Sequence, residues 1–146
     1  MTKMHAPRYI VLYAEDDQDD VDLIMDGFSQ FQQNLEIITV ADGYEALSYL
    51  SNLKPLEPSP CLVILDINMP RMNGKEALQR IRSMDRFREI PIVLFSTSVQ
   101  PADKAFAKAH DAGFLTKPVM GPQLASIAEQ LITYCSDEVK QKIRKM

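Results

Sequence analysis

Acidic residues and one lysine follow apolar runs at separate places in this 146-residue chain. Glu15 and Asp16 come after the run YIVLYA, Asp66 comes after CLVIL, and Lys117 comes after GFLT. Carboxylates that lie close together repel one another, and burial raises their pKa values further unless a cation is present. If folding brings these residues together, Lys117 supplies one positive charge, and a set of oxygen ligands suits a hard divalent ion such as Mg²⁺.

A pocket of this kind favours chemistry at phosphorus. A divalent ion could bridge to a phosphoryl oxygen and leave Asp66 free to attack phosphorus, because aspartate is an established nucleophile that forms an aspartyl-phosphate. Such a transfer depends on positioning and charge neutralisation, which the ion and Lys117 would supply. Asn68, just beyond Asp66, and Ser96, at the end of the run IVLF, complete the polar set.

The same residues also have ordinary structural interpretations. An Asp that follows a strand commonly caps a turn, and a lysine is most often a surface residue. Ser96 and Thr97 could cap the next helix. The acidic stretch after the first run could be a solvated helix start, and Asp17, Asp19 and Asp20 are expected to do only this: one caps the helix and the others favour its first turn. Joint occurrence favours the functional interpretation, because each group ends a different apolar run.

The apolar pattern predicts strands and helices in alternation. Short apolar runs predict strands at 9–14, 35–41, 61–65, 92–95 and 113–116. Apolar residues at helical spacing predict helices at 21–33, 46–53, 74–85, 102–109 and 124–132. The first helix carries the stripe Val21, Ile24, Met25, Phe28 and Phe31. Such alternation implies right-handed βαβ units, a mostly parallel sheet with helices on both faces, and a ligand crevice at the carboxyl ends of the strands.

Composition and charge exclude several classes of protein. Apolar residues make up 46% of the chain and charged residues 25%, which indicates one ordinary globular domain. The net charge of −4 argues against general nucleic-acid binding. The sequence has no signal peptide and no run long enough to span a bilayer, which favours a cytoplasmic protein without a membrane partner. Cys61 and Cys135 lack metal-type spacing, and Cys61 looks like a core residue.

Taken in order, these motifs resemble those of a response-regulator receiver domain, from Tyr9 to about Tyr134. The motifs that carry the resemblance are Glu15-Asp16, LDINMP with Asp66, Gly74 eight residues later, Pro91-IVLF-Ser96 and Lys117-Pro118. The resemblance implies a flavodoxin-like, doubly wound α/β fold, with a parallel five-stranded sheet in the order 2-1-3-4-5 and helices on both faces. It also implies a single receiver domain over residues 1–146, with a core at about 8–134, a helical extension or tail at 135–146, and no output domain.

The resemblance also implies a role for each residue of the polar set. Asp66 is the phospho-acceptor. Asp16 and Asp66 ligate Mg²⁺ directly, together with the backbone carbonyl of Asn68, while Glu15 holds the ion mainly through water. Lys117 contacts the incoming phosphoryl oxygens and pairs with Asp66.

Further residues match the switch of the family. Ser96 is the switch hydroxyl that moves to bond the phosphoryl group, and Phe114 is the aromatic ring that turns inward with it. Ser96 stands where Thr is more frequent and keeps the hydroxyl, whereas Phe114 lacks the hydroxyl of the commoner Tyr. The peptide bond between Lys117 and Pro118 is expected to be cis. Gly74 is expected to relieve crowding in the loop after the acceptor.

The favoured hypothesis is a signalling module, and not an enzyme beyond its own phosphorylation and dephosphorylation. It accepts a phosphoryl group from a histidine kinase or from a phosphotransfer protein, and within the family the resemblance favours a kinase of the phytochrome type or another hybrid kinase. It then changes its binding to a downstream protein through the fourth helix, fifth strand and fifth helix. Members often form homodimers through this face, which here covers residues 101–134, so a homodimer is one expected assembly.

Two alternatives remain open. A Mg²⁺-dependent phosphatase also passes through an aspartyl-phosphate, but it usually needs a general acid two residues after the nucleophile, where this chain has Asn68. A pseudo-receiver that binds partners without phosphorylation is disfavoured by the complete set of acidic pair, acceptor and lysine. The basic tail could contact a partner or form a solvated helix end. Its residues are Lys140, Lys142, Arg144 and Lys145.

Overall fold

A parallel sheet of five strands forms the centre of the computed structural model, which describes residues 8–97, 100–117 and 124–144. The strands are β1 (Tyr9–Ala14), β2 (Leu35–Val40), β3 (Leu62–Asp66), β4 (Ile92–Ser96) and β5 (Gly113–Thr116). Their order in the sheet is β2-β1-β3-β4-β5, and all four pairings are parallel. The predicted flavodoxin-like fold and its strand order are confirmed.

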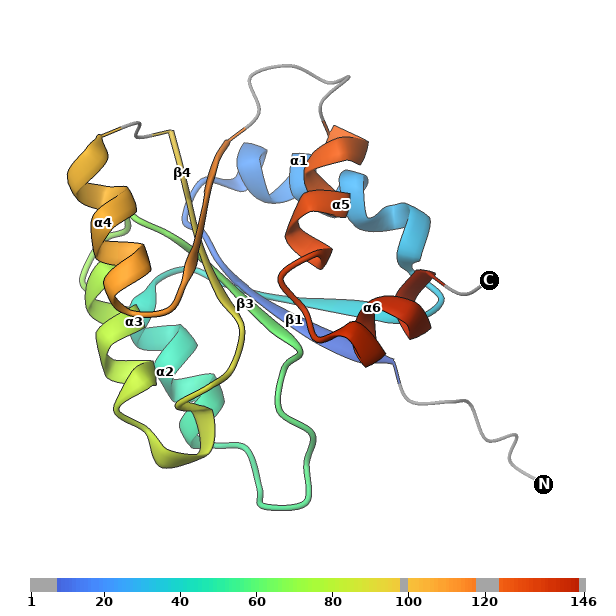
Figure 1. The fold of residues 1–146 in the computed structure, drawn as a ribbon, viewed down its shortest axis with the longest axis horizontal. Coiled ribbons are helices and arrows are strands. Elements are labelled where there is room, and N and C mark those ends of the chain that lie inside the picture. The colour runs from blue at the N-terminus through green and yellow to red at the C-terminus, as the bar shows by residue number, and fades with distance from the viewer. Residues whose placement is uncertain (1–7, 98–99, 118–123, 145–146) are drawn as a thin grey trace.

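Helices cover both faces of this sheet (Figure 1). One face carries α1 (Gln18–Phe28), α5 (Leu124–Ile132) and α6 (Asp137–Arg144), and the other carries α2 (Gly43–Ser51), α3 (Gly74–Arg82) and α4 (Pro101–Ala109). Each face therefore has its own apolar core. β3 is buried over its whole length, because it is covered on both sides and its run LVIL is apolar on both. Within the described ranges, no helix is both long and apolar enough to cross a membrane.

The register of the strands brings several carboxyl ends to one edge of the sheet. Ala14 lies opposite Leu65, and Ser96 lies opposite Thr116. Asp66 lies opposite Phe95, so the end of β3 stands between the ends of β1 and β4. Residues that follow these strands therefore surround the end of β3, as the alternating pattern predicts.

Some element boundaries differ from the sequence prediction. The first helix was expected to reach residue 33, but it ends at Phe28 and continues as a 3₁₀ turn, η1 (Ser29–Phe31). Met25 belongs to the predicted apolar stripe, but it lies at the edge of that stripe and is 41% exposed. α3 ends at Arg82, because the residues that follow form a separate 3₁₀ turn, η2 (Asp85–Phe87).

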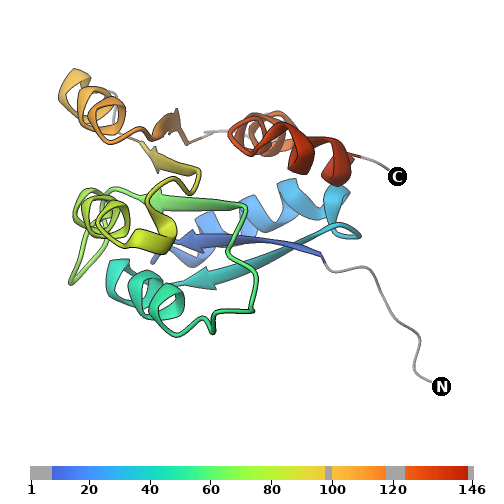
Figure 2. The same cartoon turned by 60° about the horizontal axis from the view of Figure 1, so that its bottom comes forward.

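The C-terminal segment was expected to extend the last helix or to form a tail, but it forms a separate helix. α5 ends at Ile132, and after a turn α6 lies beside α5 and the end of α1 (Figure 2). Ile143 is fully buried in the core of this face, and the side chain of Asn34 donates a hydrogen bond to its carbonyl oxygen at 3.2 Å. A straight extension would leave Ile143 and Val139 in solvent, so burial of apolar surface favours the folded-back helix.

Candidate functional site

The loop after β1 carries the first pair of acidic residues. The backbone N–H of Glu15 donates to the carbonyl of Val40 on β2 at 2.9 Å, so the strand pairing continues through Glu15. The Glu15 side chain is 1% exposed and accepts a hydrogen bond from the Tyr13 hydroxyl at 3.1 Å. Asp16, the next residue, is exposed. The two neighbours therefore offer one buried and one solvent-facing carboxylate.

Asp17 caps α1, as the sequence predicted for one residue of this stretch. Its side chain accepts hydrogen bonds from the backbone N–H groups of Asp19 and Asp20, at 2.9 and 3.3 Å. These bonds satisfy two of the N–H groups that have no partner within the helix. The cap therefore fixes the first turn of α1, from which Asp20 projects.

Asp66 completes a cluster of three carboxylates. It is the last residue of β3, and its side chain is 7% exposed. One oxygen from each of Glu15, Asp16 and Asp66 lies within 4.8 Å of the others, and these three residues are called the acidic pocket below. Crowded carboxylates, of which Glu15 and Asp66 are buried, favour a bound cation, and oxygen ligands of this kind fit a divalent ion such as Mg²⁺.

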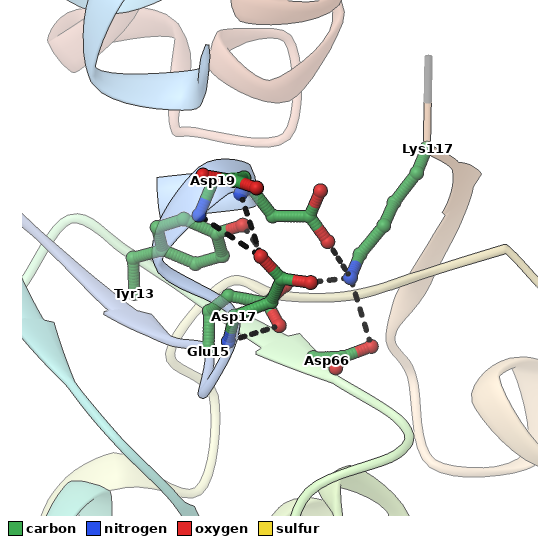
Figure 3. Close-up of polar contacts among 7 residues, drawn as sticks. Tyr13, Glu15, Asp17, Asp19, Asp66 and Lys117 are labelled. Carbon is green, nitrogen blue, oxygen red and sulfur yellow. Dashed lines mark hydrogen bonds and ion pairs between the residues drawn. The ribbon is translucent and has the colours of Figure 1, made fainter. Parts of the chain in front are cut away.

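Lys117 reaches the acidic pocket from the end of β5 (Figure 3). Its backbone N–H donates to the carbonyl of Ser96 at 2.9 Å, so the pairing of β4 with β5 aims the lysine at the pocket. Its Nζ lies 2.6 Å from Glu15 Oε1 and 3.4 Å from Asp66 Oδ1, and its side chain is 10% exposed. The predicted proximity of Lys117 and Asp66 is confirmed, although the two are far apart in the chain.

Asp20 is a residue that the sequence interpretation missed. It was expected to serve only the start of α1, but its Oδ2 lies 2.8 Å from Lys117 Nζ, so that expectation is wrong. The reason is geometric: Asp20 lies in the first turn of α1, directly after the loop that carries Glu15 and Asp16, and Lys117 reaches this turn from the end of β5. The place of Asp20 near the start of the helix was visible in the sequence, but the approach of Lys117 to α1 was not.

Burial and charge shift the pKa values in this cluster. Burial raises the pKa of Glu15 to about 7, although Lys117 acts against this shift. Burial also raises the pKa of Asp66, again opposed by Lys117. Burial alone would lower the pKa of Lys117, but hydrogen bonds to Asp20 and Glu15 outweigh it and hold that pKa above its ordinary value. The lysine is therefore a stable cation, whereas the carboxylates lack enough positive charge around them.

Gly74 permits a close approach to the backbone of Asp66. A Cβ at this position would lie 2.3 Å from the Asp66 carbonyl oxygen. The N–H of Gly74 also donates to the carbonyl of Ile67 at 3.1 Å. The expectation that Gly74 relieves crowding in this loop is confirmed.

The remaining predicted residues lie around the acidic pocket. Ser96 is fully buried at the end of β4, and it does not cap α4, since the capping position belongs to Gln100. Phe114 is half-buried on β5 and packs against the core under α2, α3 and α4. Asn68 is exposed in the loop after Asp66, whose carboxylate accepts a hydrogen bond from the Asn68 backbone. The peptide bond from Lys117 that was predicted to be cis lies outside the described residues, because it involves position 118.

A second ionic contact, not predicted from the sequence, ties down the loop between β3 and α3. Arg71 in this loop has a φ of 62°, and its Nε lies 2.7 Å from Oδ2 of the buried Asp42. The backbone N–H of Met72 donates a hydrogen bond to the carbonyl oxygen of Pro70 at 2.7 Å. The carbonyl oxygen of Met72 in turn accepts one from the backbone N–H of Gly43 at 3.0 Å. Burial alone would raise the pKa of Asp42, but the hydrogen bond and charge of Arg71, together with backbone hydrogen bonds from Glu45 and Tyr44, outweigh it and hold that pKa below its ordinary value. The loop that follows β3 is therefore fixed to the start of α2.

Comparison with known proteins matches most of the chain to one protein family. Residues 11–129 match the family described as the response regulator receiver domain. The response regulator Rcp1 of Synechocystis is 31% identical over 120 residues, which cover 80% of this chain and 82% of Rcp1. The probable methanogenesis regulatory protein FilR2 of Methanothrix harundinacea is 32% identical over 129 residues, which cover 86% of this chain and 83% of FilR2.

Solved structures show the same fold. The phosphorylated cyanobacterial phytochrome response regulator RcpA superposes with a TM-score of 0.80 and 27% identity, over 90% of this chain and 96% of RcpA. The Mn²⁺-bound form of Rcp1 superposes with a TM-score of 0.75 and 26% identity, over 86% of this chain and 92% of Rcp1. The similarity to solved structures therefore extends over most of the fold.

Proposed function

This chain belongs to the response regulator receiver domain family of two-component systems, and we propose that it accepts a phosphoryl group on Asp66 in a reaction that depends on Mg²⁺. The observation that carries the proposal is the convergence of the acidic pocket and Lys117 at one edge of the sheet. Since these groups come from the ends of β1, β3 and β5, the arrangement belongs to the fold as a whole rather than to one local turn.

Asp66 is the proposed nucleophile. One of its carboxylate oxygens attacks phosphorus and forms a P–O bond, while the bond from phosphorus to the donor breaks. The leaving atom, an imidazole nitrogen of a phosphohistidine or an acyl oxygen of acetyl phosphate, keeps the bonding electron pair. Two features of Asp66 support this role: its side chain is 7% exposed, which limits competing contact with water, and Lys117 lies 3.4 Å away.

The acidic pocket would hold the metal ion. Glu15, Asp16 and Asp66 supply its carboxylates, and the family resemblance adds the backbone carbonyl of Asn68. When bound, Mg²⁺ supplies positive charge to the phosphoryl oxygens. The Mn²⁺-bound form of Rcp1 supports divalent-ion binding in a related protein. Lys117 adds an ammonium, which stays protonated because neighbouring carboxylates keep its pKa high.

Ser96 and Phe114 are the proposed switch. The buried Ser96 hydroxyl bonds the phosphoryl group, and the Phe114 ring turns inward as Ser96 moves. A shift from mostly inactive to mostly active molecules needs about 5.5 kcal/mol of differential stabilisation. Hydrogen bonds to a charged group contribute about 1.5–3 kcal/mol each, so one from Ser96 and one from Lys117 are of the required size.

The proposed donor is a histidine kinase, either directly or through a phosphotransfer protein. The description of RcpA as a phytochrome response regulator and the likeness to Rcp1 favour a kinase of the phytochrome type. The switched face is formed by α4, β5 and α5, which would bind a downstream protein or a second copy of this chain. We expect a single receiver domain that works in the cytoplasm and has no catalytic activity beyond its own phosphorylation and dephosphorylation.

Intact-mass spectrometry with acetyl phosphate tests the proposal. The wild-type protein is expected to gain one phosphoryl group with Mg²⁺ and none when the metal is chelated. The matched variant Asp66→Asn keeps the size of the side chain and removes the nucleophile, so it should gain none under either condition. A gain of mass that persists in Asp66→Asn, or its absence from the wild type, would contradict the proposal.

A further inference from the structure

Lys117 is shared by three carboxylates. Its Nζ lies 2.6 Å from Glu15, 2.8 Å from Asp20 and 3.4 Å from Asp66. Glu15 and Asp66 belong to the acidic pocket, whereas Asp20 does not. The ammonium is therefore held from two sides, by the pocket and by the first turn of α1.

The partners within the pocket have other tasks during the reaction. Glu15 and Asp66 would direct oxygens to a divalent ion, and Asp66 would also form the bond to phosphorus. Both tasks weaken the attraction of these carboxylates for the Lys117 ammonium, because their oxygen electrons are shared with the ion or with phosphorus. Asp20 has neither task, so its contact with the lysine can persist while the other two contacts change.

Asp20 also stands on a fixed element, whereas Lys117 has a flexible side chain. The backbone N–H of Asp20 is bonded to the Asp17 side chain, which caps α1. A lysine has a flexible four-carbon stem and gives up much of its rotamer freedom when it is held in one position. A partner on a capped helix therefore restricts an ammonium that would otherwise sample several positions.

We propose that Asp20 is a positioning residue, which holds the ammonium of Lys117 in reach of the phosphoryl group while Asp66 is phosphorylated. This inference rests on the proposed function, since it concerns the same reaction. Asp20 acts through Lys117 and touches neither the donor nor the metal ion. Its side chain works as a hydrogen-bond acceptor in a fixed place, and its negative charge is secondary.

Two substitutions separate position from charge. Asp20→Asn removes the charge but keeps an oxygen that can accept a hydrogen bond from Lys117. Asp20→Ala removes both. Asp19→Ala is the matched control, because Asp19 is the preceding residue on the same turn, is exposed and carries the same charge.

The first measurement is the rate of phosphorylation by acetyl phosphate at saturating Mg²⁺, followed by intact mass over a range of donor concentrations. The maximal rate is expected to fall about tenfold in Asp20→Ala, about two- to threefold in Asp20→Asn, and not at all in Asp19→Ala. The Mg²⁺ affinity of all variants, measured by titration of the tyrosine fluorescence, should stay within about threefold of the wild type.

The second measurement needs neither metal nor phosphoryl donor. In the metal-free protein, an amine-reactive acylating reagent is added and the modification of Lys117 is followed by peptide mass spectrometry. Release of the ammonium from Asp20 is expected to speed this modification several-fold in Asp20→Ala compared with Asp19→Ala. Thermal melts of the variants check that the fold is intact.

The outcomes separate this inference from the proposed function. If the wild type is not phosphorylated on Asp66, the proposed function fails. If the wild type and Asp19→Ala are phosphorylated and Asp20→Ala reacts equally fast, only the role of Asp20 is overturned. Equal losses in Asp20→Asn and Asp20→Ala, or faster phosphorylation in both, would assign the effect to charge and would also overturn the positioning role.

Discussion

Replacement of Gly74 by Ala is expected to damage the loop on which Asp66 depends. The added Cβ would lie 2.3 Å from the Asp66 carbonyl oxygen and 3.1 Å from the Ile67 Cα, whereas ordinary contact begins at 3.4 Å. The atoms on both sides of the contact are backbone, so relief requires the end of β3 or the start of α3 to move by about 1 Å.

The cost can be compared with the gain from the substitution. Overpacking that forces backbone shifts costs about 1–3 kcal/mol, and the upper end applies here because no side chain can turn away. Ala in place of Gly within a helix recovers about 0.5–1 kcal/mol. A net loss of about 2 kcal/mol follows, which for a domain of this size lowers the melting temperature by about 4–8 °C.

Gly113→Ala is the matched control. Its Cβ would lie 2.3 Å from Cε1 of Tyr134, but that ring belongs to a side chain that is 37% exposed and can rotate into solvent. The control should change stability by less than about 1 kcal/mol. Urea unfolding and thermal melts measure both variants, and phosphorylation by acetyl phosphate should be slower in Gly74→Ala alone. Equal stability of Gly74→Ala and the wild type, or equal losses of stability in the two variants, would contradict the predicted backbone clash.

Two further predictions concern contacts distant from Asp66. Ile143→Ala should lower the free energy of unfolding by about 2–5 kcal/mol, because the Ile143 side chain is fully buried. Gln141 is exposed on the same helix, so Gln141→Ala should change that free energy by less than about 0.5 kcal/mol. Equal urea midpoints for the two variants would show that α6 is not docked. Arg71→Met should destabilise the protein at neutral pH but not in acid. The Asp42 pKa is held below its ordinary value of about 4, so the stabilisation is present above that pH and is lost as the pH falls through the lowered value. Unfolding curves of wild type and Arg71→Met should therefore converge below about pH 4, and a constant difference would contradict the assignment.

The strands and the central part of the site were predictable from the sequence for one physical reason. A strand covered on both faces needs apolar side chains on both, so β1, β3 and β4 appear as continuous apolar runs. Parallel strands end at the same edge, so a carboxylate or an ammonium after such a run is directed there. Glu15, Asp66 and Lys117 follow this rule, which places them without any knowledge of the helices.

The helix ends were less predictable, because apolar periodicity records burial rather than hydrogen bonding. Phe31 is buried in the core although it lies in a 3₁₀ turn, so the stripe continued past the end of α1 at Phe28. Ile143 similarly marks a buried position in the tail. The stripe alone does not tell whether such a residue reaches the core by a straight helix or by a reversal of the chain.

The contacts that the sequence did not reveal share one cause. Asp20 meets Lys117, and Arg71 meets Asp42, across elements whose relative position is set by the two apolar cores. An acidic residue in the first turn of a helix already has a sufficient local explanation, since the helix dipole stabilises its negative charge. The second role of Asp20 appears only when the end of β5 and the start of α1 are placed at the same edge of the sheet, because the two partners are 97 positions apart in the chain. Polar side chains that serve a local and a long-range contact at once are therefore where sequence reasoning falls short. In this chain both such contacts involve elements next to Asp66, α1 in one case and the loop after β3 in the other, so they are hidden from the sequence at the very edge of the sheet where the strand pattern places the acidic pocket.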